Sequence, residues 1–245
     1  MASTKSYGQY CPLAMASEVL CNRWTLLVVR ELLDGSTGFN EIARGLPLMS
    51  RSLLSRRLRE LETSGLVKHE QGSRGSAGSY HLTEAGMALA NVVRAMAIWG
   101  QEWIDEEPSL ESIDVRFLMW DIRRNVRPIP ELPPVFTVRF DFPDAPEGLR
   151  EHWLVFEGPE VDLCYVDPGY DVDVHLETDL RTMTRVWMGW DDIDAALRTD
   201  RMVITGPRKL TGCVRRWLGL SGLAKISKRP PNERVFKSLE AGEKV

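Results

Sequence analysis

Residues 49–70 read MSRSLLSRRLRELETSGLVKHE, and this stretch decides the fold of the first part of the chain. Leu54, Leu58 and Leu61 recur at the spacing of one helical turn, so the helix that carries them has a single apolar stripe. A stripe of this kind faces a hydrophobic core. The hydroxyl of Ser50 can cap the start of this helix, and Gly65 suits its end. The sequence therefore predicts a helix over residues 51–64 whose three leucines pack against a core.

The rest of this helix is polar and cationic. Residues 49–75 contain six Lys or Arg and three Glu, although the whole chain has a net charge of −4. A local cationic surface suits a polyanion. The alternative is an Arg-rich face that only contacts water, and charge by itself does not decide between the two.

The neighbouring segments favour a DNA-binding unit. Residues 66–71 and 79–82 have the composition of strands, and the Gly-rich segment 72–78 joins them. Before the cationic helix, residues 38–46 predict a shorter helix that Pro47 ends. This order is typical of a winged helix-turn-helix, an α+β unit whose second helix enters the major groove of DNA. The residues expected to contact DNA are Ser50, Arg51, Ser52, Ser55, Arg56, Arg59 and Arg74.

Length and composition limit the classes of protein that fit. The chain has 245 residues, which suits two domains, and we place their boundary at Pro108, giving residues 1–108 and 109–245. Its 43% hydrophobic residues are enough for two cores. Since no apolar run approaches a membrane span and residues 1–10 lack a secretory signal, we expect a cytoplasmic protein without membrane contact. The scattered cysteines and histidines predict no disulfide framework, metal site or cofactor, and no motif of an enzyme is found.

A series of motifs runs in fixed order along residues 7–103. They are Cys11-Pro12, Arg23-Trp24-Thr25-Leu26-Leu27, Arg30-Glu31-Leu32-Leu33, Gly38-Phe39-Asn40-Glu41-Ile42, Leu46-Pro47, Ser50, Leu54-Ser55-Arg56-Arg57-Leu58-Arg59-Glu60-Leu61-Glu62, Gly65-Leu66-Val67, Tyr80, Leu82-Thr83-Glu84, Gly86 and Trp99-Gly100. With these motifs the chain resembles the HxlR-type family of bacterial winged-helix regulators. The resemblance implies a two-fold dimer that binds double-stranded DNA at paired half-sites.

Two apolar segments are candidates for the dimer interface. Residues 84–106 predict one long helix, and a second helix is expected to begin near Pro12 with a buried stripe of Leu13, Ala16, Val19 and Leu20. The long helix either joins two copies of the chain, as the family resemblance implies, or packs on its own domain. Its apolar seam consists of Leu89, Val92, Val93, Met96, Trp99 and Trp103.

Cys11 is a candidate redox switch. The resemblance places it at a position that acts as a thiol or electrophile sensor in some family members. A sensing thiol needs partial exposure and a lowered pKa, and a cysteine beside the start of a helix can have both. The alternative is a small buried side chain without reactivity.

The second part of the chain predicts an α+β domain. The expected helices cover residues 114–126, 179–188, 191–197 and 207–218, and the expected strands cover 135–142, 153–157, 161–166, 172–178 and 202–205. Over residues 114–220 this order resembles the sterol-carrier-protein fold, which implies a tunnel for a small apolar ligand. The expected lining is Met183, Val186, Trp187, Leu197, Cys213 and Trp217. An ordinary filled core would use the same side chains.

Charge is unevenly distributed within this second part. Residues 131–200 carry 5 basic and 17 acidic side chains, whereas residues 207–237 carry 9 basic and 1 acidic. The acidic region is expected to avoid nucleic acid. The basic segment contacts phosphates, balances the acidic sheet surface of its own domain, or forms a solvated tail.

Taken together, the sequence predicts a sequence-specific, homodimeric transcriptional regulator that an apolar ligand or thiol oxidation modulates. The alternative function is a carrier of apolar, lipid-like or sterol-like ligands in which the winged part serves only for interaction. We expect no enzymatic activity.

Overall fold

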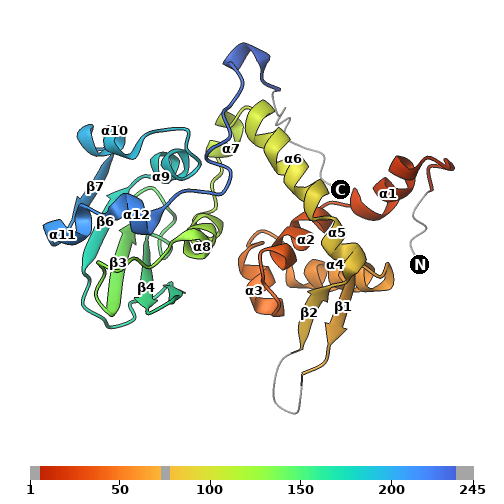
Figure 1. The fold of residues 1–245 in the computed structure, drawn as a ribbon, viewed down its shortest axis with the longest axis horizontal. Helices are drawn as coiled ribbons and strands as arrows, with labels where there is room; N and C mark the ends of the chain where they lie inside the picture. The colour runs from red at the N-terminus through yellow and green to blue at the C-terminus, as the bar shows by residue number, and fades with distance from the viewer. Residues whose placement is uncertain (1–5, 73–77, 236–245) are drawn as a thin grey trace. The chain divides into compact units, whose positions relative to one another are not determined.

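The structure is a computed structural model that describes residues 6–72 and 78–235 (Figure 1). The chain forms two compact units, residues 1–96 and residues 97–245.

The first unit has the predicted winged helix-turn-helix arrangement. In chain order its elements are α1 (Pro12–Leu20), α2 (Thr25–Leu33), α3 (Phe39–Arg44), α4 (Arg51–Thr63), β1 (Val67–Glu70), β2 (Ser79–Leu82), α5 (Glu84–Ala88) and α6 (Ala90–Trp103), of which α6 continues into the second unit. The strands β1 and β2 are antiparallel, with Val67 opposite Leu82 and Glu70 opposite Ser79. The predicted helix over residues 51–64 is therefore confirmed as α4, and the two predicted strands are confirmed as the hairpin that follows it.

The core of the first unit forms around the three leucines of α4. Leu54, Leu58 and Leu61 are buried together with side chains of α2, α3 and β1. Where α5 begins, a Cβ added at Gly86 would lie 2.1 Å from the carbonyl oxygen of Leu66, so glycine allows the helix to approach the hairpin this closely. This packing fixes the position of α4 between the shorter helix and the hairpin.

Two expectations for the first unit are wrong. The α1 helix has no buried residue within its own chain, and Leu13 is 75% exposed. An apolar stripe shows that a helix has an apolar face, but it does not show what covers that face. The predicted helix over residues 84–106 is divided at Leu89 into α5 and α6 and ends at Trp103.

The second unit contains a mixed five-stranded sheet in the order β5-β4-β3-β6-β7. In this sheet β3 and β6 are parallel and the other neighbouring strands are antiparallel. The strands are β3 (Val135–Asp141), β4 (Glu151–Glu157), β5 (Glu160–Cys164), β6 (Val174–Thr178) and β7 (Met202–Thr205). The helices are α7 (Glu107–Leu110), α8 (Val115–Asn125), α9 (Leu180–Trp187), α10 (Ile193–Arg198), α11 (Arg208–Thr211) and α12 (Val214–Leu218), followed by the short 3₁₀ helix η1 (Pro231–Glu233). The α+β class is confirmed, while the expected helix over 207–218 is divided into α11 and α12.

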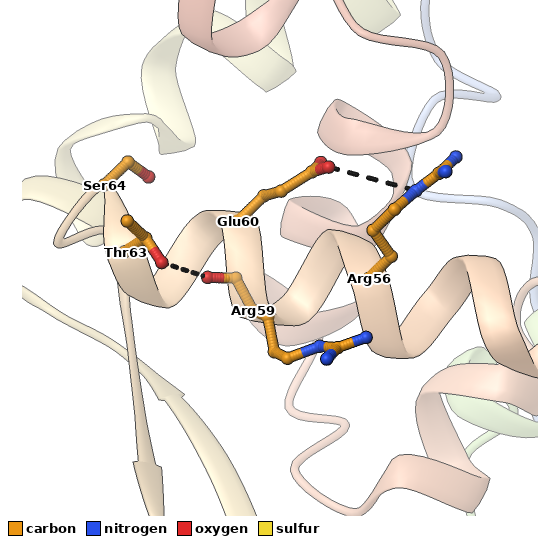
Figure 2. Close-up of a pocket in the computed structure, with 5 residues that line it drawn as sticks. All are labelled: Arg56, Arg59, Glu60, Thr63 and Ser64. Carbon is orange, nitrogen blue, oxygen red and sulfur yellow. Dashed lines mark hydrogen bonds and ion pairs between the residues drawn. The ribbon is translucent and has the colours of Figure 1, made fainter. Parts of the chain in front are cut away.

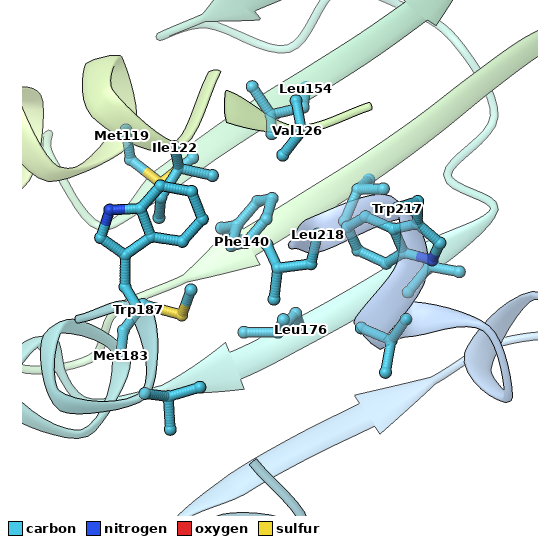
Figure 3. Close-up of a cluster of buried hydrophobic side chains, with 14 of the residues drawn as sticks. Met119, Ile122, Val126, Phe140, Leu154, Leu176, Met183, Trp187, Trp217 and Leu218 are labelled. Atoms are coloured by element: carbon cyan, nitrogen blue, oxygen red, sulfur yellow. The ribbon is translucent and has the colours of Figure 1, made fainter. Parts of the chain in front are cut away.

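The helices α8, α9 and α12 share one hydrophobic core with one face of this sheet (Figure 3). The six side chains predicted to line an apolar tunnel lie in it: Met183, Val186, Trp187, Cys213 and Trp217 are buried, and Leu197 packs against them. Trp217, for example, meets the ring of Phe136 edge-on at a centroid distance of 5.5 Å. These are the contacts of core residues, and the apolar tunnel stays a prediction, as does the sterol-carrier type of this domain.

Within the described residues, no helix is both long enough and apolar enough to cross a lipid bilayer.

Candidate nucleic-acid interface

The start of α4 is fixed by its N-cap and by α3. The hydroxyl of Ser50 accepts a hydrogen bond of 3.3 Å from the backbone N–H of Leu53, as the sequence predicted. Arg51 donates a hydrogen bond of 2.8 Å to Oδ1 of Asn40, and its guanidinium lies 5.5 Å from the ring centroid of Phe39. Arg51 therefore joins α4 to α3 in the free protein.

The outer face of α4 presents two arginines. The side chain of Arg56 is 60% exposed, and Arg59 is also exposed, while its Nε donates a hydrogen bond of 3.3 Å to the carbonyl oxygen of Ser55. Ser52 is exposed and lies 3.2 Å from the Ser50 hydroxyl, whereas Ser55 is half-buried. Of the predicted α4 residues, Ser52, Arg56 and Arg59 are thus accessible on the face opposite the three buried leucines, whereas Arg51 lies against α3.

This surface contains an open hollow of about 540 Å³ (Figure 2). Its lining residues are Arg56, Arg59, Glu60, Thr63 and Ser64. Figure 2 shows Glu60 reaching toward Arg56, while the side chain of Arg59 extends in a different direction from that of Arg56. Two guanidinium groups a turn apart on an exposed helix can each donate to a phosphate or to the edge of a guanine.

The hairpin next to α4 forms the wing. His69 and Tyr80 stack across its two strands at a centroid distance of 4.3 Å. Lys68 lies 2.6 Å from Glu70, and this hydrogen bond and charge lower the pKa of the Glu70 carboxyl. Arg74, which we predicted to hold the DNA backbone from the wing, lies outside the described residues.

Arg57 was not among the predicted site residues, although it lies next to Arg56. Its side chain is only 13% exposed, and its Nε donates a hydrogen bond of 3.1 Å to the carbonyl oxygen of Arg23. It also pairs with Glu60. The sequence position could have indicated that Arg57 is largely buried, because residue 57 lies beside the Leu54–Leu58–Leu61 stripe of α4 and residue 56 does not.

The predicted dimer residues divide into two groups. Val92, Met96 and Trp99 on α6 are 44%, 55% and 49% exposed. In contrast, Leu89 and Val93 pack against the core of the first unit. Trp103 is half-buried, with the guanidinium of Arg229 4.5 Å from its ring centroid.

Cys11 precedes the first residue of α1 and is exposed. The nearby backbone N–H groups of Ala14 and then Leu13 lower the pKa of its thiol. Cys21, just after α1, is exposed as well. Among the residues that the structure describes, no group of three His, Cys, Asp or Glu side chains is arranged to hold a metal ion.

Comparison with known proteins gives matches to the first part of the chain. The family model described as HxlR-like helix-turn-helix matches residues 19–108. YvaP of Bacillus subtilis (strain 168), an uncharacterized HTH-type transcriptional regulator, is 40% identical over 100 residues, which are 40% of this chain and 93% of YvaP. The HTH-type transcriptional regulator YodB of the same strain is 33% identical over 97 residues, 39% of this chain and 87% of YodB.

Two solved structures give similar coverage. The reduced form of YodB from B. subtilis is 33% identical and covers 38% of this chain and 93% of that chain, with a TM-score of 0.34. The redox regulator HypR in its oxidized form is 33% identical and covers 37% of this chain and 95% of that chain, with a TM-score of 0.35. Residues 109–245 lie outside the family match.

Proposed function

This chain belongs to the HxlR-like helix-turn-helix family of transcriptional regulators, and from that premise we propose that it is a homodimer that reads a specific double-stranded DNA sequence through α4. The two copies would place their α4 helices in successive major grooves, so the DNA site would consist of two half-sites related by two-fold symmetry.

The observation that carries this proposal is the division of α4 into two faces. Its leucines are buried in the core, while Arg56 and Arg59 are exposed on the opposite side beside an open hollow. An exposed cationic helix seated in this way can approach DNA without any rearrangement of the core. Ser52 and Ser55 would add shorter contacts near the helix start, and Arg74 of the wing would bind the neighbouring DNA backbone.

Exposed apolar side chains support the proposed dimer. On α1, Leu13 and Met15 are 75% and 56% exposed, and on α6 the exposed side chains are Val92, Met96 and Trp99. An apolar helix that its own chain leaves uncovered gains about 25 cal/mol per Å² when a second copy covers it, before the cost of association. We therefore assign α1 and the outer face of α6 to the dimer interface.

The test is selection from a randomised pool of double-stranded DNA with the purified protein, followed by footprinting on the selected sequence. We expect an enriched site with two-fold symmetry and protection of two successive major-groove segments on one side of the duplex. If no sequence is enriched over the starting pool, the proposal fails. A melting temperature that rises only on addition of fatty acids or sterols would then favour the alternative, a carrier of apolar ligands.

A second proposal is that oxidation of Cys11 changes DNA binding. It is supported by the exposure of Cys11 and by the backbone N–H groups that lower the pKa of its thiol. A lower pKa increases the fraction of reactive thiolate at neutral pH. Hydrogen peroxide converts a reactive thiolate to a sulfenic acid and is itself reduced to water. This treatment should change the affinity for the selected DNA in the wild type but not in Cys11→Ser, with Cys164→Ser as the matched control. Equal responses of wild type and Cys11→Ser would exclude Cys11 as the sensor.

A further inference from the structure

Arg57 differs from its neighbour Arg56 in where its side chain lies. Its side chain is 13% exposed, whereas that of Arg56 is 60% exposed. Because residue 57 lies beside the apolar stripe of α4, its guanidinium runs along the edge of the core instead of the outer face. The partners of Arg57 are accordingly groups of the protein itself.

One of these partners is a backbone carbonyl at the start of α2. Arg57 Nε donates a hydrogen bond of 3.1 Å to the carbonyl oxygen of Arg23. The orientation of that peptide unit depends on the next residue, Trp24, whose φ is 78°. Side chains with a Cβ rarely adopt this left-handed conformation, and the packing of the Trp24 indole against the core of the first unit holds it in place. The turn between α1 and α2 thus presents the Arg23 carbonyl to α4.

The other partner of Arg57 is Glu60, one turn further along α4. The carboxylate of Glu60 pairs with Nη1 of Arg57, and its second oxygen lies 3.9 Å from Nε of Arg56. Figure 2 shows the side chain of Glu60 directed toward Arg56. One carboxylate therefore stands between an arginine that is anchored to the protein and an arginine that is exposed.

We propose that Arg57 is a positioning residue for DNA recognition. It ties α4 to the turn before α2 and, through Glu60, confines Arg56 to one side of the helix. This inference rests on the proposed function, in which Arg56 reads DNA. A side chain that is already confined loses less conformational entropy on binding, so its contact contributes more to affinity. This increase in affinity applies where Arg56 makes a fixed contact with a base. Arg57 should therefore affect binding to the selected sequence more than binding to unrelated DNA.

The experiment measures binding of the full chain to the DNA sequence that the wild type selects, and to an unrelated duplex of equal length, at several salt concentrations. The variants are Arg57→Gln, Arg56→Ala and the double variant. We expect Arg57→Gln to weaken binding to the selected sequence about tenfold while leaving the unrelated duplex and the salt slope unchanged, because Arg57 contacts no phosphate. In the Arg56→Ala background, Arg57→Gln should have little further effect.

Two further variants separate positioning from simple loss of charge or of folding. Arg198→Gln removes the same charge from an exposed position on α10 and should bind both duplexes as the wild type does. Arg57→Lys keeps the charge but cannot donate in a planar fork to Arg23 and Glu60 together, so it should resemble Arg57→Gln. This second variant keeps the test valid if Arg57→Gln does not fold.

The possible outcomes are distinguishable. If Arg57→Gln and Arg57→Lys both bind like the wild type, or weaken binding equally in the presence and absence of Arg56, the positioning role is wrong. A salt slope lowered by about one would show instead that Arg57 contacts a phosphate. If Arg56→Ala itself leaves binding unchanged, Arg56 does not contact DNA and the premise of the positioning role fails, a result that is distinct from the failure of Arg57 alone.

Discussion

At the scale of single residues, His152 on β4 shows how burial changes chemistry. Its side chain is fully buried, and within the described residues neither ring nitrogen has a hydrogen-bond partner. The rings of Phe142 and Tyr165 lie edge-on to it at centroid distances of 6.0 and 5.5 Å. Loss of hydration disfavours the imidazolium and lowers the pKa of His152 to about 4.

The second unit should therefore lose stability in acid. An unfolded histidine has a pKa near 6.5, so between about pH 6.5 and pH 4 the unfolded chain binds more protons at this residue than the folded chain does. The contribution of His152 to the free energy of unfolding is therefore complete above pH 6.5. It decreases by roughly 3 kcal/mol as the pH is lowered from 6.5 to below 4. In the folded protein, the His152 ring signal in NMR spectra should titrate near pH 4, and His152→Leu should remove this part of the pH dependence. A His152 signal that titrates near 6.5 would contradict its burial.

At the scale of helices and strands, the bounds of α4 and its hairpin could be predicted because local patterns determine them. The leucine stripe, the Ser50 cap and the Gly-rich loop all act within a few residues. What could not be predicted depends on partners distant in sequence. The bond between Arg57 and the Arg23 carbonyl requires the left-handed turn at Trp24, which no sequence pattern indicates.

The two apolar helices illustrate the same limit. The α1 helix was expected to be buried and is exposed, whereas the seam of α6 is divided between side chains that face the core and side chains that do not. Periodicity identifies an apolar face but not the surface that covers it. Val93 and Met96 looked equivalent in the sequence, and only Met96 is exposed enough to meet a second copy.

Met96→Glu should therefore produce folded monomers. The added charge would have to be buried without a partner in the proposed interface, while in the monomer it would lie in water. Sedimentation velocity should show the monomer mass for Met96→Glu and the dimer mass for Asn91→Glu, which adds the same charge at an exposed polar position of α6. A Met96→Glu variant that still sediments as a dimer would exclude this face of α6 from the interface.

At the scale of the whole molecule, the basic C-terminal segment has a role inside its own unit. Lys228 donates hydrogen bonds of 2.9 and 3.2 Å to the carbonyl oxygens of Ile104 and Gln101, and it lies 3.3 Å from the carboxylate of Glu106. Arg234 lies 3.0 Å from the same carboxylate. Burial acts to raise the pKa of Glu106, but a backbone hydrogen bond and the two cations outweigh it and lower the pKa. These two cations pair with Glu106, whereas the expected pairing with the acidic region 131–200 is seen at Arg216, which lies 2.7 Å from the carboxylate of Glu131.

Lys228→Met should destabilise the second unit by about 3 kcal/mol, because it removes one partner from a buried ionic cluster. In differential scanning calorimetry the transition of the second unit should move to lower temperature, while the transition of the first unit should stay in place. Lys225→Met, at an exposed position of the same segment, is the matched control and should leave both transitions unchanged. If Lys228→Met and Lys225→Met melt alike, the cluster around Glu106 does not stabilise this unit.

The central claim for the whole molecule is that the outer face of α4 reads DNA. The most direct measurement is the affinity of wild type, Arg56→Ala, Arg59→Ala and Arg198→Ala for the selected DNA and for its single-base variants, over a range of salt concentrations. Replacing an arginine that contacts a base should weaken the binding free energy by roughly 1–3 kcal/mol and relax the base preference at one position. Replacing an arginine that contacts a phosphate should weaken binding to all sequences and lower the salt slope by about one. We predict one of these two patterns for Arg56→Ala and for Arg59→Ala, and wild-type behaviour for Arg198→Ala. If Arg56→Ala and Arg59→Ala both bind as the wild type does, with unchanged base preference and salt slope, α4 is not the DNA reader.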